Sequence, residues 1–471
     1  MELLKKKWQR IFLHPAVIVF LISALAKVIF GLAVVTDSER IISDPDAIGY
    51  FRLAENLRHH GVFSRSEQPP FAPDSVLTPV YPFFVALLLA LTGGKLWIIP
   101  VAQGLVNSLS AVLVFKTGEK LFNTRAGFIA GLCFALDPSA LVRTFSLLTE
   151  SLFTFLFLAA IFFLIQYVQR PSLKALISSA ALLGVATLCR PVGLYFFAPV
   201  AVMLFFAGIG SRKIRARNAA IYVAVFALTL SPWLIRNKLV FGMAQLTSIQ
   251  GINMLLMNAA FLEAARENID YATAEQRLEA EADSLMMTRG FTAEKIKLHY
   301  KGKQYGHQLN DPRASQVYQE LAAQKILASP LLYARVQLTG IIPSFLDTSV
   351  RDFYHFAGKE RPMFGLRALL VAGDLGFALK KFWSRVESTY LVLYLLNLGW
   401  LIVHYVLTFI AIVRLTKEKS YASLVLLTLP LFYLLFMTAP AGSERFRFPA
   451  MPYFYLLSAS TISRISWRKS K

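Results

Sequence analysis

The stretch IFLHPAVIVFLISALAKVIFGLAVV, residues 11–35, decides the fold class of this chain. It is apolar over the length that a helix needs to cross a hydrocarbon core of about 30 Å, and Lys27 is its one charged residue. Lysines at positions 5–7 precede it and predict a cytoplasmic N-terminus. The run is too long for the core of a signal peptide and lacks a clear cleavage site, so we expect an uncleaved membrane anchor.

The composition of the whole chain agrees with this opening stretch. Of 471 residues, 56% are hydrophobic and 16% are charged, and the mean hydropathy is +0.53. Soluble domains carry about 25% charged residues, so this chain has too few to cover a soluble surface. The sequence predicts an all-α integral membrane protein of about ten transmembrane helices, with outer juxtamembrane helices and a helical outer region.

The net charge of +21 argues for a membrane surface and against nucleic acid as the partner. The basic residues cluster at the ends of apolar runs, as at positions 212–217 and 468–471. Such clusters retain loops on the cytoplasmic side and attract anionic lipid headgroups. The two cysteines, Cys133 and Cys189, lie inside apolar runs and indicate neither a disulfide framework nor a metal cluster.

Apolar runs and polar breaks divide the chain into three parts. Residues 1–237 are expected to form an N-terminal transmembrane module of about seven spans, with a first outer loop at 36–78. Residues 238–388 form an outer helical region, and 389–471 a C-terminal transmembrane module of about three spans. The expected spans are 11–35, 95–115, 126–136 and its continuation, 152–167, 175–188, 192–209, 219–235, 390–413, 421–439 and 449–462. The run 83–91 is too short to span.

Two apolar stretches in the outer region, 331–346 and 364–379, stay open. Each carries charged residues, so we expect helices that lie on the membrane surface, and one or both could instead be spans. With ten spans, both termini are cytoplasmic.

Unusual polar residues gather on the outer side of this topology. Ionisable groups at membrane depth are costly, so they usually face a cavity and serve a function. Carboxylates and arginines that face one cavity suit a negatively charged substrate whose reaction needs a base. The residues concerned are Asp44, Asp46, Asp137, Arg143, Glu150, Arg190, Arg236, Glu444, Arg445 and Arg447.

Each of these residues also has a structural explanation. Asp44 and Asp46 could be turn residues after the first helix. Glu150 could match the dipole at the start of the next span. The arginines at 236, 445 and 447 could be headgroup anchors. The seven histidines show no metal-ligand spacing, and the chain has no Gly-rich phosphate loop.

Four stretches of this sequence resemble the GT-C superfamily of polytopic glycosyltransferases, and most closely its bacterial branch related to protein O-mannosyltransferases and lipid A aminoarabinose transferases. The first outer loop supplies DAIGY at 46–50, GVF at 61–63 and PVYP at 79–82. The others are LF at 121–122 with DP at 137–138 and LLTE at 147–150, then GVATLCRP at 184–191 with PWLIRN at 232–237, and RFRFP at 445–449. Together they cover roughly residues 40–240 and the last outer loop, whereas 240–388 matches no pattern.

The resemblance implies transfer of one sugar from a polyprenyl-phosphate lipid to an acceptor hydroxyl on the outer, periplasmic face. Asp46 matches the family's catalytic aspartate, which makes 1–237 the catalytic module. Arginines hold phosphate charge through paired hydrogen bonds, so Arg445, Arg447 or Arg236 could bind the donor phosphate.

The resemblance also suggests roles around the catalytic aspartate. Glu150 matches the family's second acidic position and could hold the acceptor, a metal, or the neighbours of the base. Asp44 and Asp46 could bind a divalent cation, although no third ligand is evident. Further candidate residues are Arg143, Arg190 and Tyr50.

The resemblance further implies an inverting transfer, with membrane lipids and an acceptor glycan, lipid or protein as partners. The excess of Arg and Lys and the absence of eukaryotic sorting signals suggest a bacterial inner membrane as location. Two other functions compete with this one. A transporter or flippase of lipid-linked glycans would explain the spans and arginines equally well, but internal repeats and matched broken helices are not evident. A non-catalytic envelope-assembly subunit would tolerate replacement of Asp46.

Overall fold

The computed structural model describes residues 14–292, 310–360, 387–440 and 442–465, and its regular elements there are all helices. This confirms the all-α prediction. Five of the described helices are long and apolar enough to cross a membrane. They are α2 (Pro15–Val34), α5 (Ile98–Leu121), α8 (Glu150–Gln169), α11 (Arg212–Phe241) and α21 (Ser388–Lys417).

A bent pair of helices occupies the position expected for the third span. Helices α6 (Thr124–Ala135) and α7 (Pro138–Phe145) meet at an angle of 48°. Pro138 lies at the first turn of α7, where its missing N–H costs nothing. The Asp137 carboxylate caps that turn by accepting a hydrogen bond from the backbone N–H of Ala140 at 2.8 Å. The Asp-Pro pair therefore ends one helix and starts the next.

Shorter helices stand where the remaining spans were expected. They are α9 (Leu173–Cys189), α10 (Phe197–Ala207) after the short η2 (Pro191–Phe196), α22 (Tyr421–Met437) and α24 (Met451–Ile465) after η4 (Phe448–Ala450). Each expected span thus has a helix. Among the described residues, five helices qualify as spans by length and composition, or up to seven if each bent pair counts as one span. The predicted count of about ten is therefore not confirmed.

The first outer loop folds into short helices. It contains η1 (Ser38–Ile42) and α3 (Pro45–His60), and α4 (Val80–Thr92) follows it. Gly61 ends α3 in the left-handed conformation with φ of 67°, which a glycine adopts at little cost. Helix α4 has 13 residues, in keeping with the prediction that this run is too short to span.

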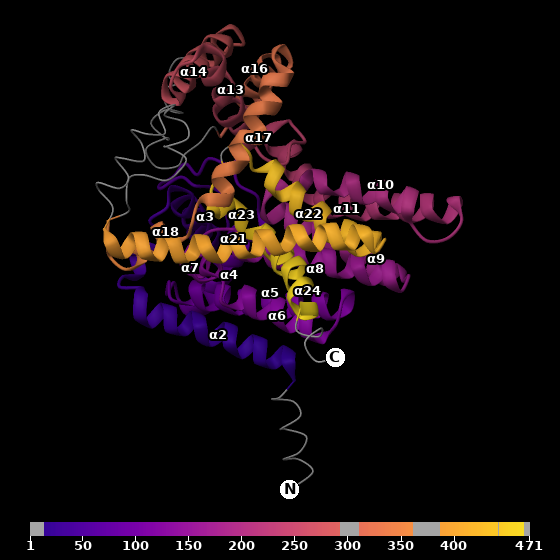
Figure 1. Cartoon of the computed structure of the whole chain (residues 1–471). Coiled ribbons are helices and arrows are strands. Elements are labelled where there is room, and N and C mark those ends of the chain that lie inside the picture. Colours follow the sequence, from indigo (N-terminus) through magenta and orange to yellow (C-terminus); the bar gives the residue numbers. More distant parts are fainter. Residues whose placement is uncertain (1–13, 293–309, 361–386, 441, 466–471) are drawn as a thin grey trace.

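The outer region carries a small hydrophobic cluster of its own. It is built by α12 (Ile249–Ile252), η3 (Asn253–Ala259), α13 (Ala260–Glu267), α14 (Tyr271–Thr288) and α16 (Pro312–Ala328), from residues such as Leu255, Leu278 and Tyr318. These helices gather at the top of Figure 1. Helix α17 (Pro330–Leu346) turns from α16 by 103° and leads back to the spans, followed by α18 (Val350–Phe356). The stretch 364–379 lies outside the described residues.

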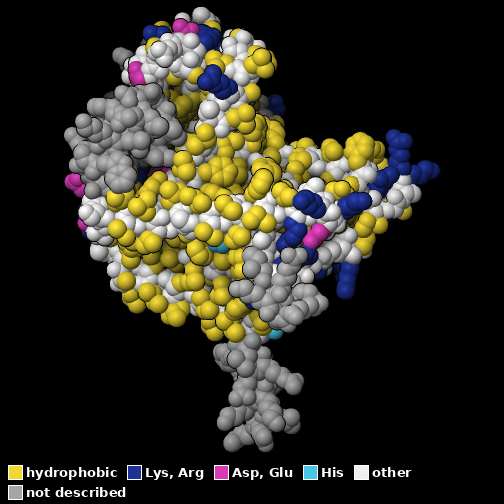
Figure 2. Space-filling model, in the orientation of Figure 1, with side chains coloured by type: hydrophobic (Ala, Val, Ile, Leu, Met, Phe, Trp, Pro, Cys, Tyr) yellow, Lys and Arg dark blue, Asp and Glu magenta, His cyan; other side chains and the backbone are white. Residues whose placement is uncertain are grey.

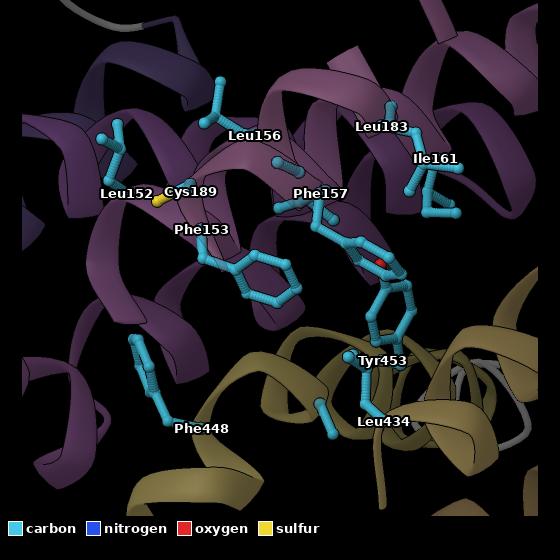
Figure 3. Packing of buried hydrophobic residues seen from close by; sticks show 14 of the residues in the cluster. Leu152, Phe153, Leu156, Phe157, Ile161, Leu183, Cys189, Leu434, Phe448 and Tyr453 are labelled. Carbon is cyan, nitrogen blue, oxygen red and sulfur yellow. The ribbon is translucent and has the colours of Figure 1, made fainter. Parts of the chain in front are cut away.

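The main core surrounds α8, two thirds of whose apolar window is buried (67%). Phe153 and Phe157 stack at 5.4 Å between ring centroids, and Figure 3 shows them facing Leu434 and Tyr453 from the C-terminal helices. The C-terminal helices thus pack directly against the N-terminal ones. Glu150, at the start of α8, is held by this core at a fixed position.

Lys and Arg side chains gather at one end of the spans. Figure 2 shows them at the tip formed by α10 and α11, while hydrophobic side chains cover the middle of the visible face. Exposed residues at that tip include Arg212, Lys213 and Arg217. A helix of 20 residues is about 30 Å long, so α8 is long enough to reach across an apolar layer of that thickness.

Candidate active site

Four elements that are far apart in sequence bring charged side chains to one place. Asp44 and Asp46 lie at the start of α3, and Glu150 begins α8. Arg190 follows the last residue of α9, and Arg445 lies on α23 (Glu444–Arg447). The site therefore exists only when the first outer loop, two spans and the last outer loop are assembled.

The guanidinium of Arg445 connects the three carboxylates. Its Nη2 donates to Oδ2 of Asp46 at 2.8 Å, and its Nε donates to Oε1 of Glu150. Its Nη1 lies 3.9 Å from Oδ1 of Asp44. One planar group thus bridges the outer loop and the start of α8, a fork geometry that lysine cannot supply.

A second arginine shares the buried carboxylate. Nη1 of Arg190 lies 2.6 Å from Oε1 of Glu150 and donates to Oγ1 of Thr149 at 3.1 Å. The ring of Phe446 lies under both guanidinium groups, 5.4 Å from that of Arg190 and 5.8 Å from that of Arg445. Three carboxylates and two guanidinium groups leave a formal excess of one negative charge.

The carboxylates differ in their access to solvent. The side chain of Glu150 is fully buried, whereas that of Asp46 is 45% exposed and that of Asp44 is 30% exposed. Asp46 is therefore the acidic group that a substrate reaches most easily. Glu150 instead pairs with Arg190 and Arg445 on the buried side of the site.

The turn explanation for Asp44 also holds. Its Oδ1 accepts a hydrogen bond from the backbone N–H of Asp46 at 3.0 Å and so caps α3, with Pro45 in the first turn. This cap places Asp46 in the first turn of the helix, where the helix dipole stabilises a carboxylate. Asp44 is thus a structural residue that also adds charge to the site.

Burial and neighbouring charge shift the titration of the outer groups. Burial raises the pKa of Asp44, with Arg445 opposing the rise and Asp46 adding to it. Burial, and then the Asp46 charge, also raise the pKa of Tyr50 well above its ordinary value, so this phenol stays protonated. Burial alone would lower the pKa of Arg445, but the surrounding carboxylates, Glu150 foremost, raise it, so the guanidinium stays charged.

A divalent cation does not fit between these carboxylates as they stand. Arg445 already lies among Asp44, Asp46 and Glu150 and neutralises the same oxygens that a cation would use. Within the described ranges, the structure groups no three His, Cys, Asp or Glu side chains that could hold a metal ion.

Three other predicted arginines lie outside this cluster. Arg143 pairs with Asp352 and Glu444 on its border. Arg447 is fully buried and donates from Nη1 to the backbone carbonyls of Ser344 and Asp347, the latter at 2.8 Å. Neither contacts Asp46 in the structure.

Arg236 lies at the outer end of α11 in an aromatic setting. Its guanidinium is 4.8 Å from the ring of Trp233, 5.1 Å from that of Phe241 and 5.4 Å from that of Phe63. Its Nη1 donates to the backbone carbonyl of Asp74 at 2.8 Å. Its side chain pairs with none of the three site carboxylates within the described residues.

Sequence reasoning missed residues that support the site. Phe446 and Thr149 could have been suspected, because each adjoins a predicted site residue in the chain. Asp352 lies in the outer region, where no motif gave a signal. Its contact with Arg143 joins residues 209 positions apart, a separation at which no local pattern predicts pairing.

The chain is similar to known proteins in part of its sequence and in its fold. Residues 73–235 match the family model of dolichyl-phosphate-mannose-protein mannosyltransferases. The fold matches the archaeal oligosaccharyltransferase AglB from Archaeoglobus fulgidus in complex with an inhibitory peptide and a dolichol-phosphate, with a TM-score of 0.53 and 16% identity. That match covers 98% of this chain and 51% of AglB, so the chain spans about half the length of its relative.

Two further structures complete the comparison. The same archaeal enzyme in complex with Zn and sulfate matches with a TM-score of 0.50 and 12% identity, over 96% of this chain and 49% of the other. ArnT from Cupriavidus metallidurans bound to undecaprenyl phosphate matches with a TM-score of 0.37 and 13% identity, over 98% and 78%. No curated protein sequence matches the chain. Residues 73–235 are thus similar to the dolichyl-phosphate-mannose-protein mannosyltransferase family, and the fold of the chain is similar to that of AglB.

Proposed function

We propose that this protein is a membrane glycosyltransferase that moves a single sugar from a polyprenyl-phosphate donor to an acceptor hydroxyl on the outer face of the membrane. The observation that carries the proposal is the half-exposed Asp46 carboxylate, held 2.8 Å from the guanidinium of Arg445. A proton acceptor and a phosphate-binding cation thus lie side by side, as such a transfer requires.

Asp46 is the general base in this proposal. It accepts the proton of the acceptor hydroxyl while the hydroxyl oxygen attacks the anomeric carbon of the donor. The bond from that carbon to the phosphate oxygen breaks, and the phosphate leaves with the electron pair. A single displacement of this kind inverts the anomeric configuration. General-base assistance contributes about 10²–10⁴ in rate.

Arg445 and Arg190 stabilise the leaving phosphate, which gains negative charge as the bond breaks. Glu150, buried between them, sets the orientation of both guanidinium groups before substrate arrives. Charged groups that are already oriented before the reaction need no reorganisation as the transition state forms, and this lowers the barrier. Arg236 and Arg447 stay candidate donor contacts from the sequence, outside the cluster at Asp46.

The relatives support the substrate class. AglB is described with a dolichol-phosphate, which is a polyprenyl phosphate, and with a peptide. Because this chain covers about half of AglB, the donor lipid and the acceptor are proposals here, with a glycan, a lipid or a protein as acceptor. AglB is also described with Zn, but our mechanism assigns no step to a metal.

We place the protein in the inner membrane of a bacterium, with both termini in the cytoplasm. The basic end of the spans would face the cytoplasm, and the site at the opposite end of α8 would face the periplasm. Residues 1–237 would then form the catalytic membrane module, 238–388 an outer helical region, and 389–471 the module that supplies Arg445.

The decisive experiment is transfer from a panel of radiolabelled polyprenyl-phosphate sugars by purified protein, with membrane extract as acceptor. Label should move to a new product with wild type and not with Asp46→Asn. Glu263→Gln, at an ion pair on α13 in the outer region, serves as the matched control and should transfer normally. Movement of intact donor across proteoliposomes without a new glycosidic bond would favour a flippase. Equal transfer by Asp46→Asn would overturn the role of that residue.

A further inference from the structure

Helix α23 presents its charged residues in two directions. Arg445 points to Asp46 and Glu150, whereas Glu444, the preceding residue, points to Arg143 on α7. The whole helix has only four residues, so its own hydrogen bonds cannot fix its orientation. Its position must come from the contacts that hold it.

Arg143 supplies the contact at the N-terminal end of α23. Its Nη2 lies 2.6 Å from Oε1 of Glu444, and the two side chains are 3% and 7% exposed. The backbone N–H of Glu444 also donates to Oδ2 of Asp347 at 3.2 Å. At this level of burial a charged pair is weakly screened by solvent and holds its geometry well.

The same guanidinium reaches the outer region. Nη2 of Arg143 also pairs with Asp352 on α18. Helix α18 is tied to the first outer loop as well, because Nε2 of His355 lies 2.6 Å from Oγ of Ser43 and the His355 carbonyl accepts from Arg40 at 2.8 Å. A cavity of about 20 Å³ between these groups is lined by Asp44, Arg143 and Asp352 among others and has room for one water molecule.

We propose that Arg143 is a positioning residue: by holding Glu444 and Asp352 together, it fixes α23 so that Arg445 reaches Asp46 and Glu150, and it couples that position to the outer region. The kinetic effect expected of this arrangement rests on the proposed function, whereas the structural role of Arg143 does not. Sequence reasoning offered Arg143 as a direct site residue, whereas the contacts give it an indirect role. A displacement of about 1 Å at a reacting centre can cost about 100-fold in rate, so a modest loosening is measurable.

Glu444→Ala tests the proposal, because Arg143 keeps Asp352 as its counter-charge and the buried guanidinium is not left unpaired. Amide hydrogen exchange of the peptide covering residues 442–450 should become at least about tenfold faster. Glu263→Ala removes a partner of Arg266 on α13 and should leave that exchange unchanged. If Glu444→Ala does not fold, Arg143→Lys keeps the charge but lacks the fork that reaches two carboxylates.

The kinetic arm uses the same variants. Glu444→Ala should lower kcat/KM for the lipid donor by about 10- to 100-fold and leave the acceptor KM unchanged. In an Arg445→Ala background it should add almost nothing, because its effect passes through Arg445. Unchanged exchange at 442–450, or losses that multiply in the double variant, would overturn the proposal. If wild type transfers no sugar, the proposed function fails, and the exchange arm still decides whether Arg143 holds α23.

Discussion

Arg445 and Glu150 lie 295 residues apart in the chain, yet the Nε of one donates to the buried carboxylate of the other. This contact joins the last outer loop to the start of the most buried span. The carboxylate has no exposure of its own, so its charge is balanced within the protein by Arg445 and Arg190. The pair therefore links the assembly of the C-terminal helices to the formation of the site.

Glu150→Gln should lower transfer by about 100-fold or more, because two neighbouring guanidinium groups lose the charge that orients them. Breaking a buried pair from one side also destabilises, so the midpoint of thermal unfolding should fall while the protein stays folded in detergent. Steady-state transfer and a thermal scan on the same preparation measure both effects. Glu281→Gln, at an exposed residue of α14, makes the same chemical change away from the site and serves as the matched control.

Normal transfer by Glu150→Gln, with or without a stability change, would contradict a role for this carboxylate in the reaction.

The sequence predicted most of this site because its members sit at helix ends. Asp46 and Glu150 each occupy the first turn of a helix, and Arg190 follows the last residue of another. The predicted topology puts those ends on one side of the membrane, where opposite charges at low dielectric are expected to pair. What could not be predicted is which arginine turns inward. Arg445 and Arg447 are two residues apart, and only the packing of α23 directs Arg445 to Asp46 and Arg447 to the backbone carbonyls of Ser344 and Asp347.

Arg445→Ala should raise the donor KM more than the acceptor KM, since its proposed partner is the lipid phosphate. Charge-assisted hydrogen bonds contribute about 1.5–3 kcal/mol each, so kcat/KM for the donor should fall by about 10- to 100-fold. Arg445→Lys should recover little, because an ammonium cannot bridge Asp46 and Glu150 at once. Initial rates with each substrate varied in turn provide the measurement.

Arg289→Ala, which breaks an exposed pair with Glu320, is the matched control and should change neither constant. A selective rise in acceptor KM in Arg445→Ala would place the arginine on the acceptor instead.

The raised pKa of Asp44 predicts a pH dependence of stability. Between the ordinary value of 3.8 and the raised one, the folded state binds more protons than the unfolded state, so stability falls as pH rises through that window. Asp44→Asn keeps the helix cap and removes the charge, so its stability should decline less over the same range. Thermal unfolding in a pH series from about 3 to 7 measures the difference.

Asp270→Asn offers a control of opposite sign. Asp270 also caps a helix, but hydrogen bonds from Thr273 lower its pKa, so its contribution grows as pH rises through the window below 3.8. Identical pH profiles for wild type and Asp44→Asn would contradict the prediction, because they would mean that the pKa of Asp44 is the same in the folded and unfolded protein.

Chelation should leave most of the transfer activity intact. The expectation follows from Arg445, whose guanidinium already occupies the space between Asp44, Asp46 and Glu150. Transfer is measured after dialysis against EDTA, then with Mg²⁺, Mn²⁺ or Zn²⁺ added back. A large loss of activity that one cation restores would mean that Arg445 leaves the carboxylates when the enzyme is active. The same carboxylate oxygens cannot bind both the guanidinium and a divalent cation at once.

Arg236 separates two functions that the sequence left open, a phosphate contact and a structural brace. Its guanidinium lies within 5.4 Å of three aromatic ring centroids and donates to the Asp74 carbonyl, so a planar group should matter more than charge. Arg236→Lys keeps the charge but stacks poorly, and it should lower stability by about 1–2 kcal/mol with little change in donor KM. Arg236→Gln should behave alike. If Lys instead matches wild type while Gln raises the donor KM, the positive charge itself contacts the donor phosphate, and the site extends from Arg445 to the outer end of α11.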